Sequence, residues 1–214
     1  MTRKTTLTIL RILYPIWMVL GIFGVIYVPS LLVIPGNSTA TAANIIANDF
    51  LFRSGIIASL LTQLAFIFAV LLLYKLFETV NKDQALLMVV LALVSVPIAM
   101  LSSLNNVAAI YSVNQPQQMM LFLSLNDQGV LIASIFWGLW LFPLGYLVYK
   151  SGFFPKVIGW ALFVGGMGYT LGSLLKLLTP NLQSIISICE VMTMGEIVFL
   201  AWLVIRGAKL NQHI

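Results

Sequence analysis

The sequence predicts an all-α polytopic membrane protein, a bundle of six transmembrane helices with both termini in the cytoplasm. Hydrophobic residues make up 61% of the 214 residues, charged residues make up only 8%, and the basic residues are distributed unevenly between the connections. An ordinary soluble domain has about a quarter charged residues, and a chain of this size cannot hide so much apolar surface from water. The composition therefore disfavours a soluble enzyme, a disordered chain and a nucleic-acid-binding protein.

Six segments are apolar over the roughly 20 residues that a helix needs to cross a bilayer. They are residues 12–34, 54–74, 85–104, 130–149, 157–178 and 184–205. Lipid cannot satisfy an open backbone, so each of these segments has to be helical. We expect the six spans to form a single membrane domain over residues 1–214.

The basic residues predict the orientation of the spans. Nine of the 11 Lys and Arg residues fall on the side of the two termini. These are Arg3, Lys4, Arg11, Lys75, Lys82, Lys150, Lys156, Arg206 and Lys209, whereas Arg53 and Lys176 fall on the other side. Because Lys and Arg collect in cytoplasmic loops, both termini are expected in the cytoplasm, with the protein in the cell inner (plasma) membrane.

Two connections are long, and both are predicted to be external. Residues 35–53 include a segment, 40–52, that could form a short interfacial helix. Residues 113–127 include an apolar stretch, 119–125, that is too short to span the membrane. We interpret both either as connectors lying on the membrane surface or as lids over an outward-facing cavity.

Glu196 is the strongest candidate for a functional residue. It lies twelve residues into the sixth span, about 18 Å deep and near the midplane of a hydrocarbon core about 30 Å thick. A charge there costs at least about 2.5–3.5 kcal/mol, so the side chain should face protein or water. With Glu190 and Thr193 it forms one polar sector, expected to face the bundle interior. It is either a proton relay or substrate ligand, or a protonated residue that only joins helices.

Other polar residues in the spans could line a pocket with Glu196 and bind a small ligand or an ion. The candidates are Glu190, Lys176, Asn106, Asn105 and Gln63. Arg53 and Asp127 share the external third of the membrane with Lys176 and Glu190. These four charges predict an ion-paired cluster or the mouth of a polar pocket, unless they are only interfacial charges at helix ends.

Glycines in the fourth and fifth spans predict close helix packing. Gly138 and Gly145 share one face of the fourth span. In the fifth span, Gly168 and Gly172 lie four residues apart on one face, and Gly165 and Gly166 make the helix thin. Such small residues let two helices approach closely. The approaching helix could belong to this chain, to a second copy in a homo-oligomer, or to another membrane partner.

The chain has few residues suited to metal, cofactor or nucleophile chemistry. It contains one cysteine, Cys189, and one histidine, His213, which lies next to the last residue. One cysteine and one histidine are too few for the common metal sites, haem sites and Cys–His nucleophile pairs, so we predict no cofactor and no metal. The polar residues within the spans favour a small ligand-binding or transport protein, and the glycine faces indicate, as the alternative, a structural or regulatory protein that associates through them. An intramembrane lipid-modifying enzyme is the least supported function.

Several stretches also point to a known family. The most specific is Gly-Tyr-Leu-Val-Tyr-Lys-Ser-Gly-Phe-Phe-Pro-Lys over residues 145–156. Weaker ones are Asp-Phe-Leu-Phe-Arg over 49–53, Val-Asn-Lys over 80–82, Gly168-Tyr169 and Gly195-Glu196. Together they resemble the bacterial multi-pass membrane proteins of the domain of unknown function 4386 family. The resemblance implies a membrane bundle without an established activity.

The resemblance carries over individual positions of this chain. They are Arg53, Asn81, Lys82, Gly145, Tyr146, Lys150, Gly152, Pro155 and Glu196. Two positions depart from the family pattern, because Trp140 stands where a histidine is expected and Gly172 where an aspartate is. The resemblance therefore supports the fold more strongly than any chemistry.

The turn between the fourth and fifth spans, Lys150–Lys156, is predicted to be cytoplasmic. Gly152 suits the end of one helix, and Pro155 suits the start of the next. Phe153 and Phe154 are expected to dip into the interface. Its two lysines, Lys150 and Lys156, could also contact anionic lipid.

Overall fold

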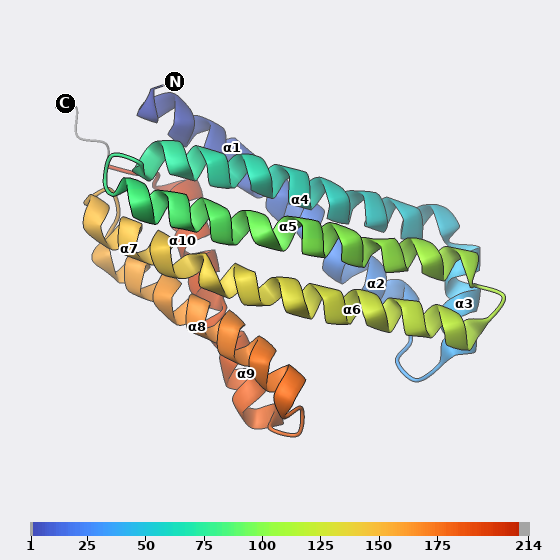
Figure 1. The fold of residues 1–214 in the computed structure, drawn as a ribbon. Coiled ribbons are helices and arrows are strands. Elements are labelled where there is room, and N and C mark those ends of the chain that lie inside the picture. The colour runs from blue at the N-terminus through green and yellow to red at the C-terminus, as the bar shows by residue number, and fades with distance from the viewer. Residues whose placement is uncertain (1, 210–214) are drawn as a thin grey trace. The chain divides into compact units, whose positions relative to one another are not determined.

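The computed structural model describes residues 2–209, and their regular structure is helical (Figure 1). Six of its helical segments are long and apolar enough to cross a membrane, which confirms the predicted number of spans. They are Arg3–Leu32, Asp49–Phe77, Lys82–Tyr111, Pro116–Ser151, Lys156–Leu178 and Gln183–Ile205. The chain is therefore an all-α multi-pass membrane protein. His213 lies outside the described residues.

Two spans change their winding near a proline. The first consists of α1 (Arg3–Gly21), the π-helical segment η1 (Ile22–Tyr27) and α2 (Val28–Leu32), and the fourth consists of α6 (Pro116–Leu139) and α7 (Leu141–Ser151). Pro29 and Pro143 have no N–H for a helical hydrogen bond, and each ring crowds the carbonyl four residues earlier. For Pro143 this is the carbonyl of the last residue of α6. Near Pro29 the helix changes from α to π winding, and near Pro143 the α-helix is interrupted between Leu139 and Leu141.

The sixth span is broken at Thr193 into α9 (Gln183–Met192) and α10 (Met194–Ile205). The Thr193 hydroxyl donates a 2.6 Å hydrogen bond to the carbonyl of Glu190. A threonine bond of this kind competes with the helical pattern and bends helices. The break gives α10 an N-terminus of its own inside the span.

The other spans are single helices, α4 (Asp49–Phe77), α5 (Lys82–Tyr111) and α8 (Lys156–Leu178). The first two have 29 and 30 residues, or about 45 Å each at a rise of about 1.5 Å per residue, against about 30 Å of hydrocarbon. The predicted spans 54–74 and 85–104 lie inside these helices but are too short. Hydropathy marks only the part of a helix that is apolar, and these helices continue through polar residues.

The predicted external loop 113–127 is wrong, because α6 already begins at Pro116. Asn126 and Asp127 interrupt the apolar pattern, but the helix passes through them. Met119 and Leu123 are buried rather than part of a surface connector or lid.

The short helix predicted over residues 40–52 is confirmed in part. It is α3 (Ser38–Ala47), and the residues from Asp49 onward belong to α4. The side chain of Asn37 caps α3 by accepting a 3.0 Å hydrogen bond from the N–H of Ala40. Such a cap satisfies one of the free N–H groups at a helix start.

The chain forms two compact units, each of which contains parts of the long helices. Among the described residues, the first unit holds 2–15, 67–95 and 132–209, and the second unit holds 16–66 and 96–131. The expectation of one membrane domain stays a prediction.

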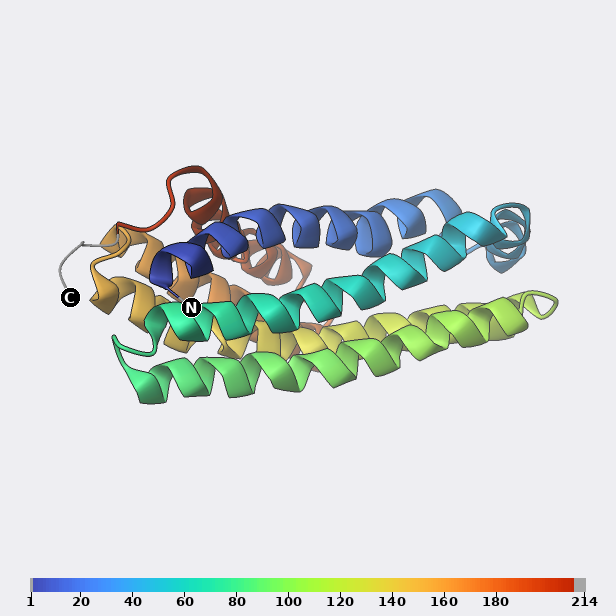
Figure 2. The same ribbon diagram turned by 90° about the horizontal axis from the view of Figure 1, so that it is seen from above.

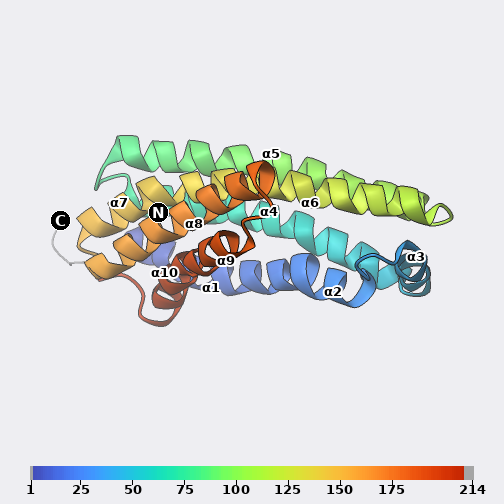
Figure 3. The same cartoon turned by 90° about the horizontal axis from the view of Figure 1, so that it is seen from below.

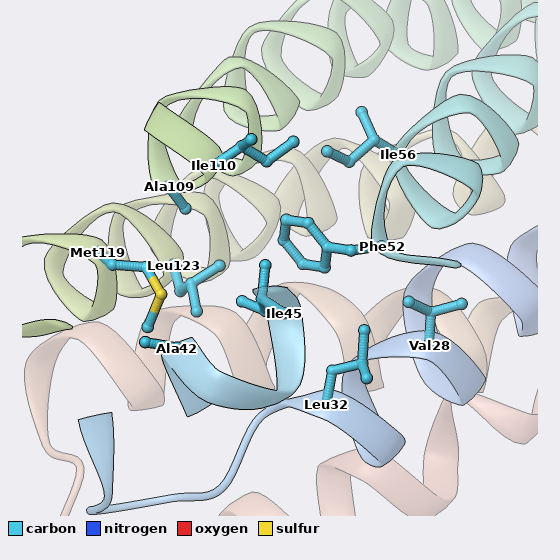
Figure 4. Packing of buried hydrophobic residues seen from close by; sticks show 10 residues of the cluster. All are labelled: Val28, Leu32, Ala42, Ile45, Phe52, Ile56, Ala109, Ile110, Met119 and Leu123. Carbon is cyan, nitrogen blue, oxygen red and sulfur yellow. The ribbon is translucent and has the colours of Figure 1, made fainter. Parts of the chain in front are cut away.

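The second unit has a hydrophobic core around α3 (Figure 4). Ile45 of α3 is 1% exposed and packs among residues from α2, α4, α5 and α6. The cluster consists of Val28, Leu32, Ala42, Ile45, Phe52, Ile56, Ala109, Ile110, Met119 and Leu123. The connection between the first two spans therefore contributes buried residues to the hydrophobic core of this unit and does not lie on its surface.

In the first unit, the start of α1 and the end of α10 lie at the same end (Figure 2). The Arg11 guanidinium donates from Nε to the carbonyl of Val204 at 2.9 Å and from Nη2 to that of Ile205 at 3.2 Å. These carbonyls end α10 and have no helical partner, so the arginine both satisfies them and suits the negative end of the helix.

The turn between α7 and α8 has the predicted backbone. Gly152 has a φ of +69° after the end of α7, and Pro155 directly precedes α8. The predicted position of Phe154 is wrong, because it is buried. Its ring centroid lies 6.1 Å from that of Phe77 and 5.5 Å from that of Phe199. The turn is thus packed onto the end of α4 and the middle of α10.

Candidate functional site

A glycine contact fixes α8 against α6 and α7. A Cβ at Gly145 would lie 2.9 Å from the carbonyl oxygen of Gly159, and one at Gly166 would lie 2.9 Å from that of Gly138. Real side chains essentially never come so close, so only glycine allows this approach. The prediction for Gly138 and Gly145 agrees with this packing. Their partners were missed, although both pairs repeat at seven residues, the spacing of packed helices.

The other glycines of α8 pack against α9 and α10, which lie beside it (Figure 3). A Cβ at Gly168 would lie 2.6 Å from the carbonyl oxygen of Cys189, and one at Gly172 would lie 3.0 Å from the Cβ of the same residue. A Cβ at Gly165 would lie 3.3 Å from the backbone nitrogen of Glu196. The chain itself therefore occupies this face, and a partner helix would have to displace α9.

Glu196 lies at the centre of this packing. Its side chain is 9% exposed, and it sits in the first turn of α10, three residues after the break at Thr193. The Tyr169 side chain of α8 lies near this carboxyl group and near the Thr193 side chain. Tyr14 of α1 is also buried and within electrostatic range of the carboxyl group.

Two features determine the chemistry of this carboxyl group. Within the described residues Glu196 belongs to no ion pair. A buried carboxylate without a cation is costly, whereas the neutral acid is not. The N-terminus of a helix favours negative charge, which helps the ionised form. In this environment the Glu196 carboxyl group could either gain and lose a proton or bind a cation.

The predicted inward position of Glu190 is wrong. Its side chain is 55% exposed, and its Oε1 lies 2.8 Å from Nζ of Lys176. The predicted sector assumed one continuous helix, but the break at Thr193 separates Glu190 on α9 from Glu196 on α10. Exposed pairs of this kind contribute at most about 1 kcal/mol to stability.

The remaining candidates belong to the second unit, and three of them have local partners. Arg53 pairs with Asp49 at 2.7 Å, and Asp127 accepts a 3.4 Å hydrogen bond from Asn126. Asn105 donates a 3.3 Å hydrogen bond to the carbonyl of Ser102. Asn106 and Gln63 are half-buried. Of the four predicted external charges, the structure pairs Lys176 with Glu190 and gives Arg53 a different partner.

Tyr169 and Gly195, two neighbours of Glu196, appeared in the sequence only within stretches that resemble the family, and neither was given a role at this site. A Cβ at Gly195 would fall on the backbone of Ala161, so this glycine lets α10 lie directly on α8. An aromatic residue within a span is typical of ordinary packing, so the pattern gave Tyr169 no functional role. Gly195 directly precedes the intramembrane glutamate, and this position could have identified it as part of the site.

Comparison with known proteins found a matching family model and a relative in sequence. A family model described as "Domain of unknown function (DUF4386)" matches residues 11–207. An uncharacterized protein from Archaeoglobus fulgidus is 34% identical over 140 residues, which cover 65% of this chain and 75% of the relative. No solved structure matches this chain. Because the relative is archaeal, the comparisons do not favour a bacterial source, and the family description names no activity.

Proposed function

The chain belongs to the DUF4386 family, and from that premise we propose that it is a small ligand-binding or transport protein in which Glu196 exchanges a proton. The observation that carries the proposal is a buried carboxyl group inside a membrane span, without an ion-pair partner among the described residues. Ionisable groups in such places serve proton relays and substrate paths in other membrane proteins.

The local geometry supports this role. The break at Thr193 places Glu196 at the start of a half-length helix, and transporters use such discontinuous helices to form their binding sites. The Tyr169 hydroxyl can donate to the ionised carboxylate or accept from the protonated acid. Glu196 therefore has a partner in both protonation states.

In this proposal a polar pocket opens outward with Glu196 at its floor. The Lys176–Glu190 pair lies near the outer end of α8. Both termini are cytoplasmic, in a cell inner membrane. A reporter-fusion map that places residues 35–53 in the cytoplasm would overturn this orientation.

Association through glycine faces is less favoured. Gly168 and Gly172 already contact Cys189 of the same chain. A structural or regulatory role would need a different surface.

Proton flux into liposomes containing the purified protein tests the proposal. A potassium diffusion potential drives protons inward, and an internal pH-sensitive dye reports them. We expect flux with the wild-type protein and a rate at least about 100-fold lower with Glu196→Gln, the loss typical of a missing proton-transfer group. Glutamine keeps the size of the side chain but cannot ionise.

Glu190→Gln is the matched control, because it removes the exposed carboxylate of the same span. It should leave the flux unchanged, and equal reconstitution of the three proteins is checked by size-exclusion chromatography. An inactive wild-type protein, or equal flux through Glu196→Gln, would contradict the proposal.

A further inference from the structure

A groove runs between α8 and the broken helix α9–α10 in the first unit. It has a volume of about 610 Å³, and Ser187 is the polar exception in its lining. The apolar lining includes Ala161 and Val164 on α8 and Val191, Met194, Gly195 and Val198 on the other side. Val191 is 71% exposed and Val198 is 50% exposed. Because these helices cross the membrane, the groove opens toward lipid.

On each wall of the groove, a tryptophan and then a basic residue follow along the same helix face. On α10, Val198 is followed by Trp202 and Arg206 at intervals of four residues. On α8, Val164 is preceded by Trp160 and Lys156 at the same intervals. Residues four apart lie on one helix face. Each wall therefore leads from an apolar groove to a tryptophan and then to a cation.

The two cations lie at one end of this helix pair. Lys156 is eight residues from Val164 and Arg206 is eight residues from Val198, or about 12 Å along each helix. The backbone N–H of Lys209, just after α10, donates a 2.9 Å hydrogen bond to the carbonyl of Phe153, just before α8. This bond joins the segments that flank the two cations.

Neither cation is neutralised by the protein. Both are exposed, and neither belongs to an ion pair within residues 2–209. The Arg206 guanidinium lies 5.9 Å from the ring centroid of Trp202, and Lys156 Nζ lies 5.2 Å from that of Tyr149. Residues 150–162 and 199–209 contain no Asp or Glu.

We propose that the groove binds an acyl chain of an anionic phospholipid whose phosphate is held by Lys156 and Arg206. Tryptophan prefers the level of the headgroups, which is where Trp160 and Trp202 then lie. The two positive charges select an anionic headgroup over a zwitterionic one. This site does not depend on the role of Glu196.

Native mass spectrometry of the purified protein tests the proposal with phosphatidylglycerol and phosphatidylcholine of identical acyl chains. We expect the wild-type protein to prefer phosphatidylglycerol. The double variant Lys156→Gln/Arg206→Gln should bind it about 30-fold more weakly, since each basic residue contributes roughly a factor of five at an anionic surface.

Lys75→Gln/Lys82→Gln is the matched control, because it removes the same amount of charge from α4 and α5, which do not line the groove. It should leave the preference intact. Equal binding by the Lys156/Arg206 variant, or an equal loss in the control, would overturn the proposal, because the attraction would then be a general effect of charge.

A second measurement on the wild-type protein does not depend on how the variants fold. Phosphatidylglycerol with a photoreactive group in its acyl chain should label peptides that contain Val164 and Val198. Val198→Trp, which fills the groove, should abolish this labelling. Labelling that is spread evenly over the six spans would overturn the acyl-chain site.

Discussion

Gly195→Ala is expected to lower the free energy of unfolding by about 2 kcal/mol. The new Cβ would lie 2.8 Å from the carbonyl carbon of Ala161 and 3.1 Å from the backbone nitrogen of Gly165. Backbone atoms cannot rotate away, so overpacking costs about 3 kcal/mol, of which better helix propensity offsets about 1 kcal/mol. Unfolding by sodium dodecyl sulfate in mixed micelles, followed by tryptophan fluorescence, measures the difference.

Gly172→Ala provides the matched control, because Gly172 lies on α8 and packs against a side chain of α9. Its new Cβ would meet only the Cβ of Cys189, at 3.0 Å. A side chain can shift slightly, so the cost of packing and the gain in propensity should cancel to within about 0.5 kcal/mol. Equal stability of the two variants would show that α10 does not lie on α8 as described.

Phe154→Ala should lower the free energy of unfolding by about 4 kcal/mol. Phe154 is 4% exposed and packs between Phe77 and Phe199, so truncation leaves a cavity where three helical segments meet. Removal of a buried phenylalanine ring typically costs about 3–5 kcal/mol. The same detergent titration measures the loss.

Phe153→Ala is the control, because Phe153 is half-buried. Its ring stacks on Phe77 at a centroid distance of 6.2 Å and lies 5.6 Å from the guanidinium of Arg3. We expect a loss of about 1–2 kcal/mol, since part of this ring stays exposed after folding. If both rings only dipped into the interface, the two variants would be equally stable, and that result would contradict the structure.

The six spans could be predicted because the cost of polar groups in lipid dominates the sequence pattern. The turn at Gly152 and Pro155 was equally predictable, since each residue has a distinct backbone preference. Glu196 stood out for the same reason as the spans, as an ionisable group where lipid excludes charge.

The errors have a common physical cause. Hydropathy reports contact with lipid, and it does not report where a helix ends. The start of α6 was therefore placed beyond Asp127 rather than at Pro116, and α4 and α5 were made too short. The break at Thr193 depends on a single hydroxyl bond, and without it Glu190 and Glu196 appear to share a face.

The helix contacts depend on pairs of residues far apart in the chain. Gly138 and Gly145 predicted a close approach, but the pattern did not identify Gly166 and Gly159 as their partners. Tyr169 became part of the site only when α8 was placed against α10. A single sequence identifies candidate residues, and their partners require the packing.

The central proposal is that Glu196 exchanges a proton, so that its carboxyl group is neutral at lower pH and ionised at higher pH. Infrared spectroscopy of the protein in lipid at neutral pH tests it through the carbonyl stretch of a neutral carboxyl group. We predict a band that weakens as the pH rises, disappears in Glu196→Gln and persists in Glu190→Gln. A wild-type spectrum without this band, or the same band in Glu196→Gln, would contradict the claim.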